Sequence, residues 1–229
     1  MLQRWSYTEK RGETVPKDTF FNLSLEKQEK VIRSAISEFL KHGFEKANVG
    51  VIAKQAGVAK GSIYQYFDNK KELFLHAVNW SMKLLMNKYQ KNVISMNIDI
   101  FTYFYETAAP LMQMLREEKE PAVFVQEVFL GRYGSVKDES MAAMLKVADN
   151  YVLGLVRQGK ENGSVRKDID DQTLAMFMTA VSIKLKENLL NKAKSAGDDI
   201  IGGGFDKYIN YIKDMMELLK NGMGDRTCS

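Results

Sequence analysis

Lysine and aromatic side chains are crowded together over residues 56–74, which read AGVAKGSIYQYFDNKKELF. Lysine supplies the charge that attracts a polyanion, and tyrosine can pack its ring on a core while directing its hydroxyl at a phosphate oxygen. Two interpretations follow from these residue types. The segment is either an amphipathic helix that buries its rings beneath a solvated surface, or a helix whose exposed side contacts a nucleic acid.

The net charge of the chain is concentrated around this segment. The 229 residues carry a formal net charge of +4. Five lysines and one acid lie between Lys46 and Lys71, so this region holds the whole excess and the remaining residues balance. A neutral protein with one basic segment indicates a local anionic partner, although the same lysines could serve only to solubilise a helical surface.

Side chains for enzymatic or metal chemistry are scarce. The only histidines, His42 and His76, have no cysteine or histidine companions at metal-binding spacing, and Cys228 is the single cysteine. No general acid–base pair, nucleophile–histidine arrangement or glycine-rich phosphate loop is present in the sequence. We therefore expect no enzyme, no metal and no cofactor. The lone cysteine and the lack of a long apolar run favour a cytoplasmic protein without a membrane partner.

Helical periodicity dominates the chain, and strand signals are weak. Apolar stripes predict four N-terminal helices, over residues 25–42, 49–56, 60–67 and 70–89. Ser24, Asn48 and Asn69 stand where helix N-caps are expected. Further helices are predicted near residues 98–117, 121–133, 139–162, 170–193 and 205–220. The predicted fold class is therefore all-α.

Three short helices with a tight turn between the second and third are the layout of a helix-turn-helix. In that motif the third helix enters the DNA major groove with its N-terminal side chains at the base edges. In residues 60–67 the apolar Ile63 and Phe67 are four positions apart and should face inward. Lys60 and Gln65 are left facing outward, where Gln65 could pair with adenine or bind a phosphate. These positions favour the DNA-binding interpretation.

Several short strings in this region occur in a specific order and spacing: Phe39 with Gly43-Phe44, then residues 52–58 (IAKQAGV), 60–67 (KGSIYQYF) and 69–73 (NKKEL). Together they resemble the tetracycline-repressor (TetR) family of bacterial transcriptional regulators. The resemblance implies a helix-turn-helix DNA-binding domain over residues 24–85. It implies a larger helical domain for ligand binding and dimerisation over residues 86–229.

The first 23 residues precede the matching region and show no usable periodicity over residues 1–15. We expect residues 1–23 to form an N-terminal extension. Residues 1–14 are either a native tail without regular structure or the product of a wrongly chosen start codon, with translation beginning at Val15.

The resemblance also assigns roles to individual positions. The positions implied to contact DNA are Asn48, Val49, Ala59, Lys60, Gly61, Ser62, Tyr64, Gln65, Tyr66 and Lys70. Asn48 falls where the family has a hydroxyl residue that caps the second helix and touches phosphate, and Tyr66 and Lys70 fall on phosphate-contacting positions. Gly50 replaces a longer polar side chain, and Gln65 replaces a frequent histidine. The operator sequence therefore stays open.

Aromatic and methionine side chains gather in the middle helices of the C-terminal region. The candidate effector pocket consists of Trp80, Tyr103, Phe104, Met112, Phe124, Glu127, Phe129, Tyr133, Met144 and Tyr151. A mostly apolar pocket with few polar anchors is typical of a small-molecule site. The alternative is that these residues are ordinary core, and that Glu127, the candidate polar anchor, is a surface residue.

The last two predicted helices carry apolar stripes that the resemblance assigns to a homodimer interface. These residues are Leu174, Phe177, Met178, Val181, Leu185, Tyr208, Ile212, Met215 and Leu219. The function that the resemblance implies is a homodimeric repressor, released from a palindromic double-stranded DNA operator by a small hydrophobic effector. The alternative is an architectural or cell-cycle DNA-binding protein of the same fold without an effector.

Overall fold

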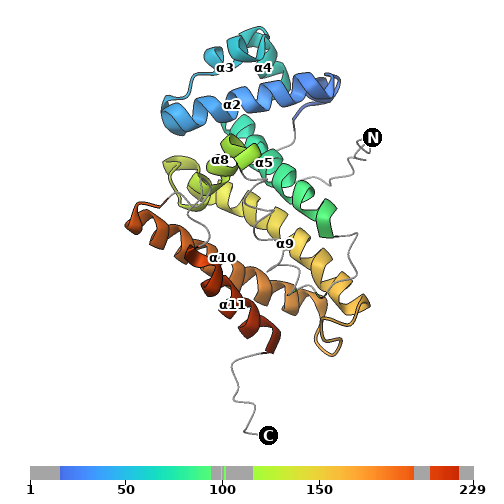
Figure 1. Ribbon diagram of the computed structural model, residues 1–229. Coiled ribbons are helices and arrows are strands. Elements are labelled where there is room, and N and C mark those ends of the chain that lie inside the picture. Colours follow the sequence, from blue (N-terminus) through green and yellow to red (C-terminus); the bar gives the residue numbers. More distant parts are fainter. Residues whose placement is uncertain (1–15, 94–98, 100, 102–115, 199–206, 222–229) are drawn as a thin grey trace, which may run out of the picture. The chain divides into compact units, whose positions relative to one another are not determined.

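The computed structural model describes residues 16–93, 99, 101, 116–198 and 207–221 (Figure 1). All regular structure within these residues is helical, which confirms the predicted all-α class. The chain divides into two compact units, one ending at Ala77 and the other beginning at Val78. None of the described helices is long and apolar enough to cross a membrane. The division at residue 77 and the predicted domain limit at residue 85 both fall within one helix, α5.

The N-terminal unit is built from helices of very different length, drawn from blue to blue-green in Figure 1. They are α1 (Asp18–Phe21), α2 (Leu25–Lys46), α3 (Val49–Ala56), α4 (Lys60–Tyr66) and the first part of α5 (Lys70–Val93). Helix α3 contacts both α2 and α4. Helix α2 continues beyond its predicted end at residue 42, through a local break at Gly43, before it stops at Lys46.

The predicted helix starts at residues 25, 49 and 70 are confirmed, because each N-cap side chain accepts the expected hydrogen bond. Ser24 Oγ accepts from the backbone N–H of Lys27 at 3.3 Å. Asn69 Oδ1 accepts from the N–H of Glu72 at 3.0 Å, and Glu72 Oε2 accepts in return from the N–H of Asp68 at 2.9 Å. Side-chain acceptors thus satisfy N–H groups that the helix itself leaves unpaired.

Aromatic rings form the centre of the N-terminal unit. Phe39 of α2 and Phe74 of α5 are fully buried, with ring centroids 4.9 Å apart in an edge-to-face arrangement. Ile52 of α3 and Ile63 of α4 are also buried. Between α3 and α4 the chain turns at Gly57, whose φ of 67° favours glycine. The turn places α4 against the core with one face exposed.

Of the predicted N-terminal extension, residues 1–23, the structure describes residues 16–23, which contact the N-terminal unit. Helix α1 belongs to the N-terminal unit, since the backbone N–H of Lys17 donates to the carbonyl of Tyr66 at 2.9 Å. Phe20 is 1 % exposed and packs among Tyr66, Phe67 and His76. A four-residue helix has no periodic pattern, so tertiary contacts alone specify it.

The C-terminal unit contains the remainder of α5 and four further described α-helices. The elements are α8 (Lys119–Phe129), the 3₁₀ turn η1 (Gly134–Val136), α9 (Lys137–Glu161), α10 (Asp171–Ala196) and α11 (Ile209–Asn221). The predicted helix 121–133 ends earlier, because the chain turns at Gly131 with φ 68°. Most of the predicted helix 98–117 lies outside the described residues.

Helices α9 and α10 lie side by side and share the core of this unit (Figure 1). Val156, Val165, Ala175 and Met178 form a buried cluster there. Val165 follows α9, and its backbone N–H donates to the carbonyl of Gly159 at 2.9 Å. A Cβ at Gly159 would lie 2.4 Å from Cγ2 of Val165, so only glycine permits this close approach.

Candidate nucleic-acid interface

Helix α4 has one buried and one exposed face, as its sequence predicts. Ile63 is buried, and so is Phe67, which follows the last helical residue. The backbone N–H of Phe67 donates to the carbonyl of Ile63 at 2.9 Å. The predicted DNA-contact residues that are exposed or half-buried on this face are Ala59, Lys60, Gly61, Ser62, Tyr64 and Gln65. Their contact with DNA stays a prediction, but their placement is compatible with it.

Tyr64 and Tyr66 are placed differently from each other. Tyr64 is 45 % exposed, whereas Tyr66 is only 8 % exposed. The ring of Tyr66 lies 5.9 Å from that of Phe20, centroid to centroid, so α1 covers this side chain. The phosphate contact that the resemblance implies for Tyr66 would require an exposed side chain, but this one is buried. Val49, also predicted to contact DNA, is buried in the core.

Lys70 is bound within the protein. Its ammonium donates to the carbonyls of Glu45 at 2.9 Å and Ala47 at 3.3 Å, and lies 4.9 Å from the centre of the Phe44 ring. A lysine in this position stabilises the carbonyls at the end of α2. A phosphate contact of Lys70 stays a prediction, and it would have to compete with these bonds.

Asn48 is held at the start of α3 from two directions. Its Oδ1 accepts from the N–H of Gly50 at 2.8 Å, and its own N–H donates to Oε1 of Glu38 at 2.9 Å. Glu38 is 3 % exposed, and no sequence pattern marked it as a site residue. A Cβ at Gly50 would lie 3.1 Å from Asn48 Oδ1 and 3.7 Å from Cδ of Lys60. The glycine thus leaves room beside the cap and the lysine stem.

Two lysines of α2 also approach the turn between α3 and α4. Lys27 Nζ donates to the carbonyl of Gly57 at 3.1 Å. A Cβ at Gly57 would lie 3.8 Å from Lys27 Nζ and 3.9 Å from Lys30 Nζ, so both ammonium groups converge on the turn. Both lysines lie outside residues 46–71, the segment that holds the net charge of the sequence, and only folding brings them beside it. The basic surface is therefore larger than the sequence segment that first indicated it.

The predicted effector-pocket residues are mostly buried where they are described. Phe124, Phe129, Tyr133 and Met144 are buried, and Trp80, Glu127 and Tyr151 are half-buried. Tyr103, Phe104 and Met112 lie outside the described residues. One open surface groove, of about 420 Å³, is lined by residues of α2 and by Gln55. A second, of about 480 Å³, is lined by residues of α10, and neither groove includes a predicted pocket residue.

Glu127 already has partners inside the C-terminal unit. Its Oε1 accepts from Arg132 Nη1 and its Oε2 from the hydroxyl of Tyr133, both at 2.9 Å. Burial, followed by the charge of Glu127 and this hydrogen bond, raises the pKa of Tyr133 far above its ordinary value. Tyr133 is therefore a neutral donor at physiological pH. An effector that used Glu127 as an anchor would have to exchange one of these bonds.

The predicted dimer residues fall into two groups. Phe177 is 54 % exposed, and Val181, Leu185, Tyr208, Ile212, Met215 and Leu219 are half-buried. Met178 instead lies in the α9–α10 cluster, and the half-buried Leu174 packs against that cluster, so both have partners within the chain and their place in an interface stays a prediction. Met176, which no prediction included, is exposed beside Phe177.

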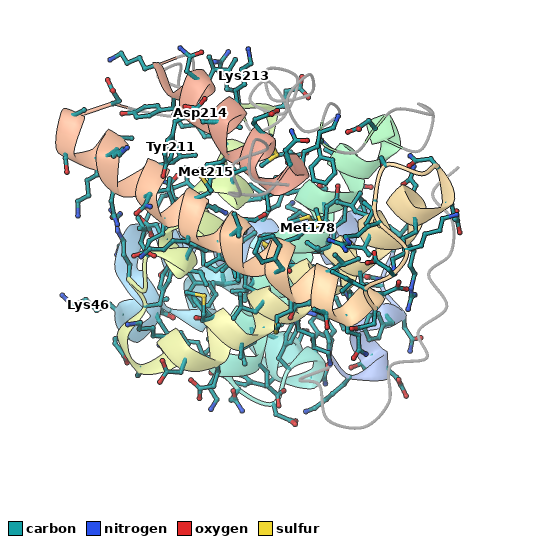
Figure 2. All side chains as sticks on the ribbon, turned by 90° about the horizontal axis from the view of Figure 1, so that it is seen from below. Lys46, Met178, Tyr211, Lys213, Asp214 and Met215 are labelled. Carbon is teal, nitrogen blue, oxygen red and sulfur yellow. The ribbon has the colours of Figure 1, made fainter. Side chains whose placement is uncertain are left out.

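Helix α11 has no buried residue. Figure 2 shows α11 beside α10, with the exposed Lys213 and Asp214 on its outer edge and Tyr211 and Met215 on the side toward α10. Lys192 of α10 places its ammonium 4.3 Å from the centre of the Tyr211 ring. The apolar residues of α11 are thus only half covered within a single chain.

Comparison with known proteins finds similar transcriptional regulators. Residues 31–77 match the profile of the family described as bacterial regulatory proteins, tetR family. The uncharacterized HTH-type transcriptional regulator YerO of Bacillus subtilis is 37% identical over 68 residues, which span 30% of this chain and 23% of YerO. The biofilm operon icaADBC HTH-type negative transcriptional regulator IcaR of Staphylococcus aureus is 26% identical over 144 residues, covering 59% of this chain and 75% of IcaR.

Solved structures share the fold. The transcriptional regulator FadR of Bacillus subtilis, in complex with stearoyl-CoA, superposes with a TM-score of 0.60 at 19% identity and covers 86% of this chain and 99% of FadR. The fatty acid degradation regulator FadR of Bacillus halodurans gives 0.58 at 20% identity, covering 90% and 100%. At these identities the likeness shows the fold alone. It confirms a helix-turn-helix unit followed by a larger helical unit.

Proposed function

Because the chain belongs to the TetR family of bacterial transcriptional regulators, we propose that it is a cytoplasmic homodimeric repressor. It binds a palindromic operator and is released from that operator by a small hydrophobic effector. The observation that carries this proposal is the exposed face of α4, held to the core by Ile63 and Phe67 while Lys60, Tyr64 and Gln65 face solvent. The similarity to IcaR, a negative regulator, supports repression.

The chemistry of α4 fits the major groove. Gly61 and Ser62 are small, so the helix backbone can approach the DNA closely. Lys60 supplies positive charge for a phosphate, and the Tyr64 hydroxyl can donate to a phosphate oxygen. The Gln65 side-chain amide can form two hydrogen bonds with adenine, which is a base-specific contact. Lys60 and Tyr64 therefore position the helix, and Gln65 reads sequence.

A second copy of the chain would cover the exposed apolar residues of α10 and α11. Met176 and Phe177 are exposed on α10, as is Leu218 on α11. Apolar side chains of this size gain about 1.5–3 kcal/mol each on full burial, so pairing of these helices is favourable. A dimer presents two copies of α4 to half-sites about 34–36 Å apart, which explains why we propose a palindromic operator.

The effector proposal depends on the apolar residues of the C-terminal unit. Phe124 and Tyr133 pack edge to face with centroids 5.5 Å apart, and Phe129 lies nearby in sequence on α8. An effector that binds better to the state unable to hold DNA shifts the population toward that state. Helix α5 contributes residues to both units and is the covalent route for this coupling.

The bonds of Glu127 favour the second candidate function. The carboxylate is satisfied by Arg132 and Tyr133, so a ligand is not needed to pair it. An architectural DNA-binding protein of this fold would need no effector. The two functions differ in whether any small molecule releases the protein from its DNA.

Selection of DNA duplexes from a random-sequence library tests the proposal directly. The full-length protein should enrich a palindromic site with two half-sites one helical turn apart. Lys60→Ala should bind that site more weakly, while Lys146→Ala, which changes an exposed lysine of α9, should bind it as the wild type does. Failure of the wild type to enrich any duplex would refute the proposed function.

A further inference from the structure

The C-terminal end of α4 is closed by residues that precede the helix-turn-helix. The last four carbonyls of a helix have no partner within the helix. In α4, the carbonyl of Tyr66 accepts from the backbone N–H of Lys17 at 2.9 Å, and that of Tyr64 accepts from Lys17 Nζ at 3.1 Å. The carbonyl of Gln65 accepts from the hydroxyl of Thr19. Residues 17 and 19 thus satisfy three consecutive carbonyls of the candidate recognition helix.

An aromatic side chain and an ion pair anchor these two residues. Phe20 is 1 % exposed, and its ring centroid lies 5.9 Å from Tyr66, 5.1 Å from Phe67 and 5.4 Å from His76. Lys17 Nζ also pairs with a carboxylate oxygen of Asp68. Residues 17–20, which we call the strap, therefore bind both the end of α4 and the start of α5.

Helix α4 depends on such external contacts. It has only seven residues, and helices shorter than about 12 residues are marginal on their own in water. Its N-cap, Ala59, offers no side-chain hydrogen bond. The strap lies outside residues 31–77, the part that matches the family profile. The profile therefore carries no information about how this chain closes the end of α4.

We propose that the strap holds the last turn of α4 in the conformation that reads DNA and thereby sets operator affinity. This proposal rests on the proposed DNA-binding function. Lys17 and Thr19 are positioning residues, since each acts through the α4 backbone. When the strap is released, the last turn frays and Tyr64 and Gln65 lose their fixed positions. The apparent Kd for operator DNA then rises as the fraction of molecules with an ordered α4 falls.

Substitution of Thr19 provides the sharpest test. Thr19→Val keeps the shape of the side chain and removes the hydroxyl, while Thr19→Ser keeps the hydroxyl. Ser34→Ala is the matched control, because Ser34 Oγ also donates to a backbone carbonyl, that of Lys30 at 2.8 Å, in the same unit but within helix α2 rather than at α4. Phe20→Ala is a second, stronger perturbation of the strap.

Two measurements are made on the full-length proteins. Hydrogen exchange reports the opening of the α4 amides. Binding to the duplex that the wild type selects from a random-sequence library reports affinity over a range of salt concentrations. Loss of one intramolecular hydrogen bond corresponds to about a two- to tenfold change in an equilibrium constant. We expect Thr19→Val to bind about that much more weakly, with faster exchange in residues 64–67, and Thr19→Ser and Ser34→Ala to resemble the wild type.

The salt dependence separates positioning from direct contact. Substituting a positioning residue lowers the affinity for DNA without changing the number of phosphates that the protein neutralises. The slope of log Kd against log salt for Thr19→Val should therefore equal that of the wild type. Equal affinities of Thr19→Val and the wild type, with or without faster exchange, would overturn the strap proposal and leave the proposed function standing. Failure of the wild type to select any duplex would refute the proposed function itself.

Discussion

Helix α9 contains two glycines in opposite surroundings, and replacing each with alanine tests how closely the chain packs at the end of this helix. Gly159 is buried, and a Cβ there would lie 2.4 Å from Cγ2 and 3.2 Å from Cβ of Val165. Gly154 is exposed, and a Cβ there would have no neighbour within 4 Å. The same substitution therefore meets a tight contact at one site and open space at the other.

The two variants are expected to change the free energy of unfolding in opposite directions. Alanine in place of glycine within a helix is favourable by about 0.5–1 kcal/mol, and nothing opposes this gain at Gly154. At Gly159 the new methyl group displaces Val165 from its cluster with Val156 and Met178. Overpacking of this kind costs about 1–3 kcal/mol, which exceeds the helical gain. We expect Gly154→Ala to raise the free energy of unfolding and Gly159→Ala to lower it by about 1 kcal/mol.

Urea unfolding followed by circular dichroism, at equal protomer concentrations, measures both changes. A double-mutant cycle with Val165→Ala adds a specific check, because removing Cγ2 of Val165 relieves the clash. The double variant should then be more stable than the sum of the two single effects predicts. Equal stabilisation by Gly159→Ala and Gly154→Ala would show that the contact between position 159 and Val165 does not oppose a side chain there.

Three other substitutions test the DNA surface, the proposed dimer and the support of α3. Lys60→Ala should reduce the slope of log Kd against log salt by about 0.9 for each lost phosphate contact, measured by fluorescence anisotropy, and an unchanged slope would remove Lys60 from the interface. Phe177→Glu places a charge on the exposed apolar part of α10 and should convert a dimer to monomers in sedimentation equilibrium; a stable dimer would contradict this interface. Glu38→Ala leaves the N–H of Asn48 without its acceptor and should lower the free energy of unfolding by about 1–3 kcal/mol, whereas Glu38→Gln retains an acceptor and should cost less; equal losses would rule out the hydrogen bond as the cause.

Local patterns were sufficient to predict the helix-turn-helix. The N-caps at Ser24, Asn48 and Asn69, and the inward positions of Ile63 and Phe67, depend on neighbours within a few residues. Periodicity and capping are properties of short segments, so the sequence contains them directly. The all-α class and the starts of α2, α3, α4 and α5 follow from the same signals, whereas α1 does not.

Contacts between distant segments could not be predicted in this way. The burial of Tyr66 depends on Phe20, and the position of Lys70 depends on the carbonyls at the end of α2. An apolar stripe also does not distinguish a core from an interface. Met178 and Phe177 are adjacent in one predicted stripe, yet one packs against α9 and the other is exposed.

The central claim is that α4 reads the operator. Its most direct test compares the DNA sequences selected from a random library by the wild type and by Gln65→Ala. The wild type should select a palindrome, and Gln65→Ala should lose base preference at one symmetry-related position in each half-site while the rest of the site is kept. Identical base preferences at every position, or a wild type that selects no sequence, would contradict it.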